Sequence, residues 1–156
     1  MASRRNDITM SDAELMRFLD EERVLTCATL GPNGRPHLMP LWYVREGPTL
    51  LAWTYSKSQK IRNLERDPRA TLQVEAGRDV YGELRGAMLE CDVAIEGNPA
   101  RVGEVGLRLM ARYTGAPLPP RGARRRPEAG FQARGAPLHA DAHRLLGSPE
   151  AGRLLS

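Results

Sequence analysis

Short β-rich runs separated by turn signals occupy most of the first two thirds of the chain. Residues 24–30 and 37–44 are two such runs, and Gly-Pro-Asn-Gly at residues 31–34 lies between them. This arrangement predicts a β-hairpin, because that tetrapeptide supplies the residues that tight turns require. Three further runs follow at residues 49–54, 69–75 and 80–96. Together they predict a mainly β fold with antiparallel strands.

The longest run, residues 80–96, changes face midway. Val80 and Leu84 occupy even positions, whereas the apolar residues of its second half are odd: Ala87, Leu89, Cys91, Val93 and Ile95. One extra residue at Gly86 would restore the alternation, so we expect a β-bulge there. Two strands that meet at Gly86 are the alternative. The run at residues 24–30 is apolar at both parities, which predicts a strand covered on both faces.

Two helices are predicted beside the strands. Ser11 and Glu14 form a capping box for a helix that runs to about residue 22. Leu15, Phe18 and Leu19 give this helix one apolar face. The pair Asn98-Pro99 predicts the start of a second helix, which runs to about residue 113. Its buried stripe is expected to comprise Val102, Val105, Leu109 and Met110.

The only two lysines of the chain, Lys57 and Lys60, lie in one stretch that leads into a short predicted helix. Ser56 or Ser58 can cap this helix, and Arg62 adds a third positive charge to its first turns. Cations at a helix start oppose the helix dipole, and a bound anion would remove the conflict. Amides, hydroxyls and ammonium groups that converge there form a receptor for a phosphate or a polycarboxylate. A solvated basic surface turn is the alternative interpretation.

Charge and hydropathy argue against nucleic-acid binding by residues 1–114 and against a membrane-spanning segment. The net charge is +4, and residues 115–156 carry all of it, with seven arginines against three acids. Because residues 1–114 sum to zero, this body has no electrostatic footprint for nucleic acid. No apolar run approaches the ~18 residues that a membrane span needs, and no signal-type segment follows the first residues. We therefore expect a cytoplasmic protein.

The cysteines and histidines predict no metal site. Cys27 and Cys91 lie inside apolar runs, which predicts buried, reduced thiols rather than a disulfide. The three histidines, at positions 37, 139 and 143, offer no set of ligands.

The character of the chain changes at Gly115. Residues 115–156 contain no Val, Ile, Thr, Trp or Tyr, whereas six Gly and six Pro make up over a quarter of them. We predict a folded domain over residues 1–114 and a disordered tail over residues 115–156 that cannot build a strand, with a helical patch at residues 141–146. The abrupt change also motivates the hypothesis that the tail is read from the gene in a shifted frame.

Four motifs follow one another along roughly residues 10–114. They are Leu25-Thr26-Cys27-Ala28-Thr29-Leu30 with Gly31-Pro32-Asn33-Gly34-Arg35-Pro36, then Pro40-Leu41-Trp42-Tyr43-Val44, then Thr54 with the run from Ser58 to Arg69, and finally Tyr81-Gly82-Glu83-Leu84-Arg85-Gly86. In this order they resemble the pyridoxamine 5'-phosphate oxidase-like split β-barrels, in particular the flavin- and deazaflavin-dependent oxidoreductases. Relatives of this kind place a last strand after the helix that ends near Tyr113, and the tail resembles no such strand. The last strand is therefore expected to be missing.

The resemblance implies a six-stranded antiparallel split β-barrel of Greek-key type, like FMN-binding proteins, with flanking helices. It also implies a homodimer with two cofactors in grooves between the subunits. The ring of the cofactor would lie along Met39, Pro40 and Leu41. The residues that the resemblance places at its phosphate are Ser58, Lys60 and Asn63, with Thr54, Ser56 and Lys57 beside them. Arg85 would come from the partner subunit, or it forms ordinary cross-strand charge pairs.

The function that the resemblance implies is hydride transfer between a deazaflavin (coenzyme F-420) or FMN and a small organic substrate. No catalytic side chain is predicted, because the cofactor ring carries this chemistry. A non-catalytic flavin-, deazaflavin- or haem-binding barrel is one alternative. Nucleic-acid binding through the arginine-rich residues 121–126 is another, from a different class.

Overall fold

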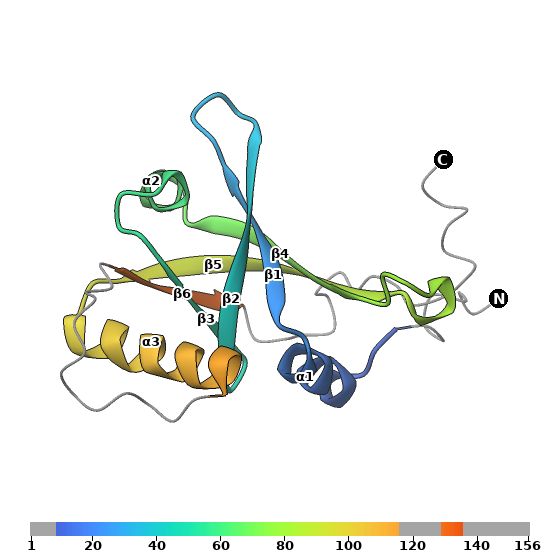
Figure 1. Cartoon of the computed structure of the whole chain (residues 1–156). Helices are drawn as coiled ribbons and strands as arrows, with labels where there is room; N and C mark the ends of the chain where they lie inside the picture. Colours follow the sequence, from blue (N-terminus) through green and yellow to red (C-terminus); the bar gives the residue numbers. More distant parts are fainter. Residues whose placement is uncertain (1–8, 116–128, 136–156) are drawn as a thin grey trace.

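Six antiparallel strands close into a barrel in a computed structural model that describes residues 9–115 and 129–135. The order around the barrel is β1-β2-β3-β6-β5-β4, and β4 pairs with β1 to close it (Figure 1). The strands are β1 (Val24–Leu30), β2 (Pro36–Glu46), β3 (Thr49–Thr54), β4 (Arg69–Ala76), β5 (Arg85–Glu96) and β6 (Ala129–Gly135). The helices are α1 (Asp12–Glu21), α2 (Gln59–Arg66) and α3 (Pro99–Thr114), with a short 3-10 turn, η2 (Tyr81–Glu83). The predicted split-barrel fold is confirmed.

The hairpin and both helix starts follow their sequence signals. The turn after β1 is closed by Gly31 N–H donating to the Arg35 carbonyl at 2.9 Å, and Gly34 takes a φ of 77°, which glycine adopts without strain. The capping box at Ser11 forms, and the Asn98 side chain caps α3. Met110 is 41% exposed, so its predicted place in the buried stripe of α3 is wrong.

The predicted β-bulge at Gly86 is wrong, and so is its alternative of two strands meeting there. The chain turns through η2 at Tyr81–Glu83, and β5 begins at Arg85, opposite Ala76 of β4. Val80 and Leu84 therefore lie outside the strand, half exposed to solvent. The alternation of β5 needs no bulge, because Val80 and Leu84 lie on either side of the 3-10 turn and neither belongs to the strand.

Strand β6 corrects the prediction that the tail cannot form a strand. Ala129–Gly135 pairs with β3 on one edge and with β5 on the other. A strand between two others is held by backbone hydrogen bonds at both edges, so weak β-propensity does not prevent it. The last strand is present, and the barrel extends beyond residue 114. The arginine-rich segment and the predicted helical patch at residues 141–146 lie outside the described residues.

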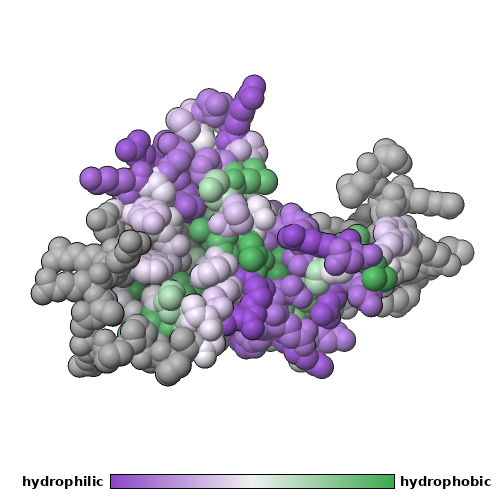
Figure 2. Space-filling model, viewed as in Figure 1, coloured by the Kyte–Doolittle hydropathy of each residue, from purple (hydrophilic) through white to green (hydrophobic). Residues whose placement is uncertain are grey.

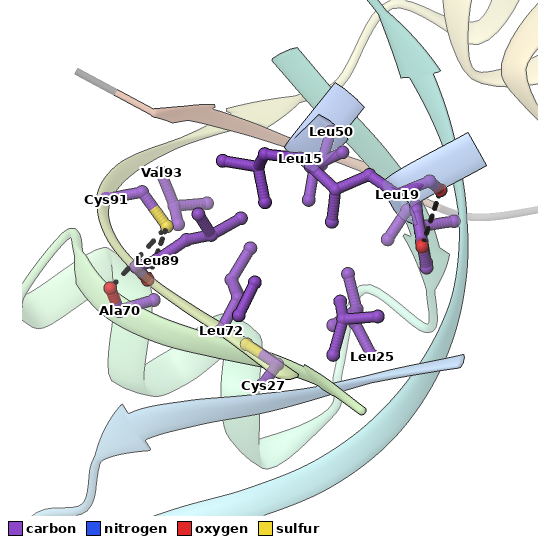
Figure 3. Close-up of a cluster of buried hydrophobic side chains, with 14 of the residues drawn as sticks. Leu15, Leu19, Leu25, Cys27, Leu50, Ala70, Leu72, Leu89, Cys91 and Val93 are labelled. Atoms are coloured by element: carbon purple, nitrogen blue, oxygen red, sulfur yellow. Dashed lines mark hydrogen bonds between the residues drawn. The ribbon is translucent and has the colours of Figure 1, made fainter. Parts of the chain in front are cut away.

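The inward side chains fill the barrel with one apolar core. Leu15 and Leu19 of α1 close one end, and alternate residues of β1, β4 and β5 converge on them (Figure 3). Cys27 and Cys91 are buried free thiols, as predicted, and burial raises the pKa of Cys27 to about 11 and that of Cys91 to about 12. Both thiols therefore stay protonated at neutral pH.

The outer face of β1 and β2 carries an apolar band that the described residues leave largely uncovered, apart from the Tyr113 ring of α3, which stacks on Trp42 with 4.4 Å between the ring centroids. The register Val24↔Trp42, Thr26↔Pro40, Ala28↔Leu38 and Leu30↔Pro36 puts these residues on one face. Leu38 is 57% exposed and Trp42 51%. Figure 2 shows apolar surface gathered over the middle of this view, where β1 and β2 lie. Within the part of the chain that the structure describes, the prediction that β1 is covered on both faces is therefore wrong. Among the described residues no helix is long and apolar enough to cross a membrane.

Candidate anion site between strand β3 and helix α2

The candidate site lies where β2 and β3 diverge. The two strands pair only from Tyr43↔Ala52 to Glu46↔Thr49. Continued in the same register, the ladder would place Leu41 opposite Thr54, but it stops before that point. Pro40 has no N–H to donate to a ladder, which suits it to an unpaired edge. The end of β3 is therefore free to turn into α2, and the first half of β2 pairs with β1 alone among the described strands.

Lys60 is the central residue of the site. The residue is only 7% exposed, and its Nζ donates a hydrogen bond of 2.7 Å to Thr54 Oγ1. In the described part of the chain no carboxylate forms an ion pair with it. Burial lowers the pKa of Lys60 because it removes water from the charged form. A buried ammonium group without an anion is costly, and an anionic ligand beside it would offset this cost.

Ser58 occupies the N-cap position of α2 but does not cap it. Its side chain makes no capping hydrogen bond and lies with its Oγ 3.4 Å from Thr54 Oγ1. The first amides of the helix, those of Gln59 and Lys60, have no acceptor within the helix. The first turn of α2 contains no acidic residue. Two hydroxyls, two amides and one ammonium group are thus collected at one helix start, and we call Thr54, Ser58 and Lys60 the anion cradle.

Two other predicted residues lie beside the anion cradle. Ser56 is half-buried and Lys57 is exposed, both in the turn between β3 and α2. The backbone of this turn is held by Ser58 N–H donating to the Tyr55 carbonyl at 3.0 Å. Lys57 can therefore add long-range positive charge, but it is not part of the anion cradle.

Asn63 points away from the anion cradle. It is fully buried, and its Nδ2 donates to Thr29 Oγ1 of β1 at 3.0 Å. Its Oδ1 accepts from Gln59 Nε2 at 2.9 Å and from Arg66 Nη2 at 3.3 Å. Its direct contact with a phosphate stays a prediction, and the geometry of this structure favours a role in holding α2.

Met39, Pro40 and Leu41 lie on the part of β2 that has no partner on its second edge. Met39 and Pro40 are exposed, and Leu41 is half-buried against the core. Because β3 does not pair here, backbone groups on this edge are available to a ligand. The structure therefore brings the two predicted halves of the site, the strand edge and the anion cradle, to the same split in the barrel.

Arg85 is not brought to this place within one chain. It lies at the start of β5, opposite Ala76, whereas α2 leads into the other end of β4 at Arg69. Figure 1 shows these two ends on opposite sides of the molecule. Arg85 instead pairs with Glu21 at 3.2 Å, and its guanidinium lies 5.0 Å from the centroid of the Phe18 ring.

Sequence reasoning missed the polar residues that hold α2 in place. Thr29, Gln59 and Arg66 form the network around Asn63, and Arg66 Nη2 also donates to the Leu30 carbonyl at 2.6 Å. The spacing of Gln59 and Asn63, four residues apart on one helix, was an available signal. The contact with Thr29, 34 residues earlier, had no local signal.

His37 Nδ1 is also buried without a hydrogen-bond partner among the described residues.

An open groove of about 660 Å³ lies elsewhere, on the outer face of the barrel. Its walls come mainly from β1, β4 and β5, with Pro36 of β2 and Asp67, and include Ala28, Leu30 and Thr71. None of the three cradle residues lines it. The groove adjoins the apolar band, so it belongs with the uncovered face rather than with the anion cradle.

The lowered pKa of Lys60 predicts a distinct dependence of stability on pH. Between the folded-state pKa and the ordinary value of 10.5, the unfolded chain binds more protons than the folded one, so Lys60 makes the free energy of unfolding rise with pH. The buried thiols act in the opposite direction, because their folded-state pKa values are raised. We therefore expect the unfolding free energy of the wild type minus that of Lys60→Met to rise as the pH approaches 10.5 from below, measured by urea denaturation. A flat difference would show that Lys60 carries no cost of burial.

The chain matches known proteins over the whole barrel. A family model described as pyridoxamine 5'-phosphate oxidase matches residues 11–135, which include the anion cradle and β6. A conserved hypothetical protein from Mycobacterium tuberculosis is 35% identical, with 86% of each chain covered and a TM-score of 0.76. An F-420 reductase is 24% identical, with 77% of this chain and 91% of that chain covered and a TM-score of 0.61. A haem storage protein from Vibrio cholerae is 16% identical, with 80% and 89% covered and a TM-score of 0.61. A comparison with curated proteins gave no match.

Proposed function

Because the chain belongs to the pyridoxamine 5'-phosphate oxidase family, we propose that it is an oxidoreductase that uses FMN or the deazaflavin coenzyme F-420. Its substrate would be a small organic molecule that exchanges a hydride with the cofactor. The observation that carries the proposal is the buried Lys60, whose ammonium group donates to the Thr54 hydroxyl and has no ion pair among the described residues.

The chemistry of the anion cradle fits the phosphate of such a cofactor. Lys60 would neutralise one negative charge, and the hydroxyls of Thr54 and Ser58 would donate hydrogen bonds to phosphate oxygens. The first amides of α2 add donors, and the positive end of the helix dipole favours the anion. A bound phosphate would also relieve the unfavourable burial of Lys60.

The remaining groups of the site would orient the ring and keep it dry. A bound flavin or deazaflavin supplies the hydride-transferring ring. The unpaired edge of β2 at Met39, Pro40 and Leu41 offers backbone groups to the polar rim of that ring. Leu41 packs against the barrel core and excludes water from this side.

We propose a homodimer in which the apolar band lies at the interface. The band exposes Leu38, Trp42 and their neighbours on a single face, and an exposed apolar patch of this kind marks a contact surface. In such a dimer Arg85 of one subunit would contribute to the site of the other, since within one chain it lies at the far end of β4 from α2. We expect a chain with Leu38→Lys and Trp42→Lys together to be a monomer, measured by sedimentation. A wild-type monomer would contradict the proposed interface.

The choice between the two cofactors rests on one motif. The form Ser58-x-Lys60-x-Arg62-Asn63-Leu64 resembles the deazaflavin branch, so F-420 is the cofactor that we expect to bind more tightly. A haem-binding relative has the same fold, and His37 would be the available ligand among the described residues.

Absorption spectra test this proposal directly. The purified chain, titrated with each cofactor and passed through a desalting column, should retain absorbance at about 420 nm with F-420 or about 450 nm with FMN. The reduced cofactor bound to the chain should then be reoxidised by a small organic acceptor. A Soret band after addition of haem, together with no retention of either cofactor, would favour the haem-binding alternative. Retention of no cofactor at all would contradict the proposal.

A further inference from the structure

A polar network with two buried members, Thr29 and Asn63, and two exposed ones, Gln59 and Arg66, ties α2 to the end of β1. Asn63 Nδ2 donates to Thr29 Oγ1, and Arg66 Nη2 donates both to Asn63 Oδ1 and to the Leu30 carbonyl. Gln59 Nε2 completes the network by donating to Asn63 Oδ1. We call Thr29, Asn63 and Arg66 the helix latch. Thr29 is 3% exposed and Asn63 is fully buried.

Burying polar side chains is an energetically costly means of attaching so short a helix. An isolated helix of eight residues is not stable in water, so α2 depends on contacts with the barrel. Ile61 and Leu64 already bury apolar side chains in the core. Buried polar groups stabilise little beyond this, but their hydrogen bonds require one specific geometry. The latch therefore fixes where α2 lies rather than merely that it packs.

The two ends of the helix latch connect to the two halves of the candidate site. On the helix side, Asn63 is less than one turn from Lys60 of the anion cradle. On the strand side, Thr29 pairs with His37, and two residues along the same ladder Cys27 pairs with Met39 of the proposed ring-binding edge. A change in the position of α2 relative to β1 would therefore alter the distance between the cradle and that edge.

We propose that Asn63 and Thr29 are positioning residues that hold the anion cradle at the spacing required by a ligand with both a ring and a phosphate. This rests on the proposed function. A ligand that spans both halves gains from their fixed separation, because the second contact then costs little further ordering. A ligand that uses one half gains nothing from the latch. The latch thus selects for phosphorylated ring cofactors without touching them.

The test compares ligands that use both halves or only one. Thr29→Val removes the acceptor for Asn63 at nearly constant shape, and Thr29→Ser is the matched control that keeps the hydroxyl. The probes are FMN, riboflavin as the ring alone and inorganic pyrophosphate as the anion alone. The same comparison applies to F-420 and its phosphate-free core. We expect Thr29→Val to weaken FMN binding about tenfold and to leave riboflavin and pyrophosphate binding unchanged, with Thr29→Ser close to wild type.

Asn63→Ala distinguishes positioning from direct contact. If Asn63 positions the cradle, it should weaken FMN binding like Thr29→Val, and the double variant should be no worse than either single one. Equal losses for FMN and pyrophosphate in Asn63→Ala, with Thr29→Val unchanged, would instead make Asn63 a phosphate ligand and overturn the proposal. Unchanged FMN binding in both variants would also overturn it.

Amide hydrogen exchange without ligand separates this proposal from the proposed function. In Thr29→Val we expect faster exchange in residues 59–64 and at the β1–β2 turn, with β4 and β5 unchanged. If the wild type binds no cofactor, the proposed function fails, but the exchange result still decides whether the latch holds α2. Identical exchange in wild type and Thr29→Val would show that the helix latch does not hold α2 in place, even if FMN binds.

Discussion

Replacing Lys60 with methionine is expected to weaken the binding of FMN or F-420 about a hundredfold or more. Methionine keeps the length of the side chain and removes its charge, so the phosphate would lie in a buried site without a cation. The same substitution should raise the stability of the chain without cofactor by about 1 kcal/mol, because the charge of Lys60, a residue that is 7% exposed, no longer has to be buried. Calorimetric titration and urea denaturation measure the two effects.

Lys57→Met is the matched control, since Lys57 is exposed in the turn just before α2. We expect it to weaken binding by less than about tenfold at low salt and to leave stability unchanged. Weaker cofactor binding together with higher stability in Lys60→Met would identify Lys60 as a functional cation. A lysine that only supported the fold would cost stability when replaced. If Lys60→Met lowers stability and leaves binding intact, the anion cradle has another purpose or none.

Ending the chain at Gly115 is expected to abolish cooperative unfolding. Such a chain lacks β6, so β3 and β5 each lose a partner along their length and expose unpaired backbone groups. The gap would open the barrel core to water and favour aggregation. Thermal unfolding followed by circular dichroism should show no sharp transition, and a hydrophobic dye should bind the shortened chain.

A single backbone change makes the same test in the full-length chain. Ala133 pairs with Leu50 on one side and Val93 on the other, so Ala133→Pro removes an N–H from the middle of a central strand. We expect a loss of about 2–4 kcal/mol in the free energy of unfolding, and Ala133→Ser, which keeps the N–H, should lose less than about 1 kcal/mol. Equal stability of the two variants would show that β6 is not part of the barrel in solution.

Local signals in the sequence were sufficient for most of the barrel. The turn at residues 31–34 and the cap at Ser11 are each determined by residues within four positions of one another, and both formed as predicted. Strand β6 could not be predicted in this way. Its residues have low β-propensity, and they form a strand because β3 and β5 lie on both sides, which is a property of the closed barrel.

In the candidate site too, some features follow from local sequence and others only from the packing of the whole barrel. Lys60 and Ser58 were found because charge and capping patterns at a helix start are local. The burial of Lys60, its hydrogen bond to Thr54 and the contact of Asn63 with Thr29 arise from how α2 lies on the barrel. The sequence placed Asn63 at the phosphate by its position in a motif, whereas the structure directs its amide into the barrel wall.

The affinity ratio between FMN and riboflavin for the wild-type chain tests the central claim most directly, with F-420 and its phosphate-free core as the parallel pair. These ligands share a ring and differ in the phosphate, so the ratio isolates the contribution of the anion cradle. We predict that calorimetric titration gives at least one phosphorylated cofactor an affinity about a hundredfold or more above that of its phosphate-free counterpart. Equal affinities within both pairs would contradict the assignment of Thr54, Ser58 and Lys60 as a phosphate site.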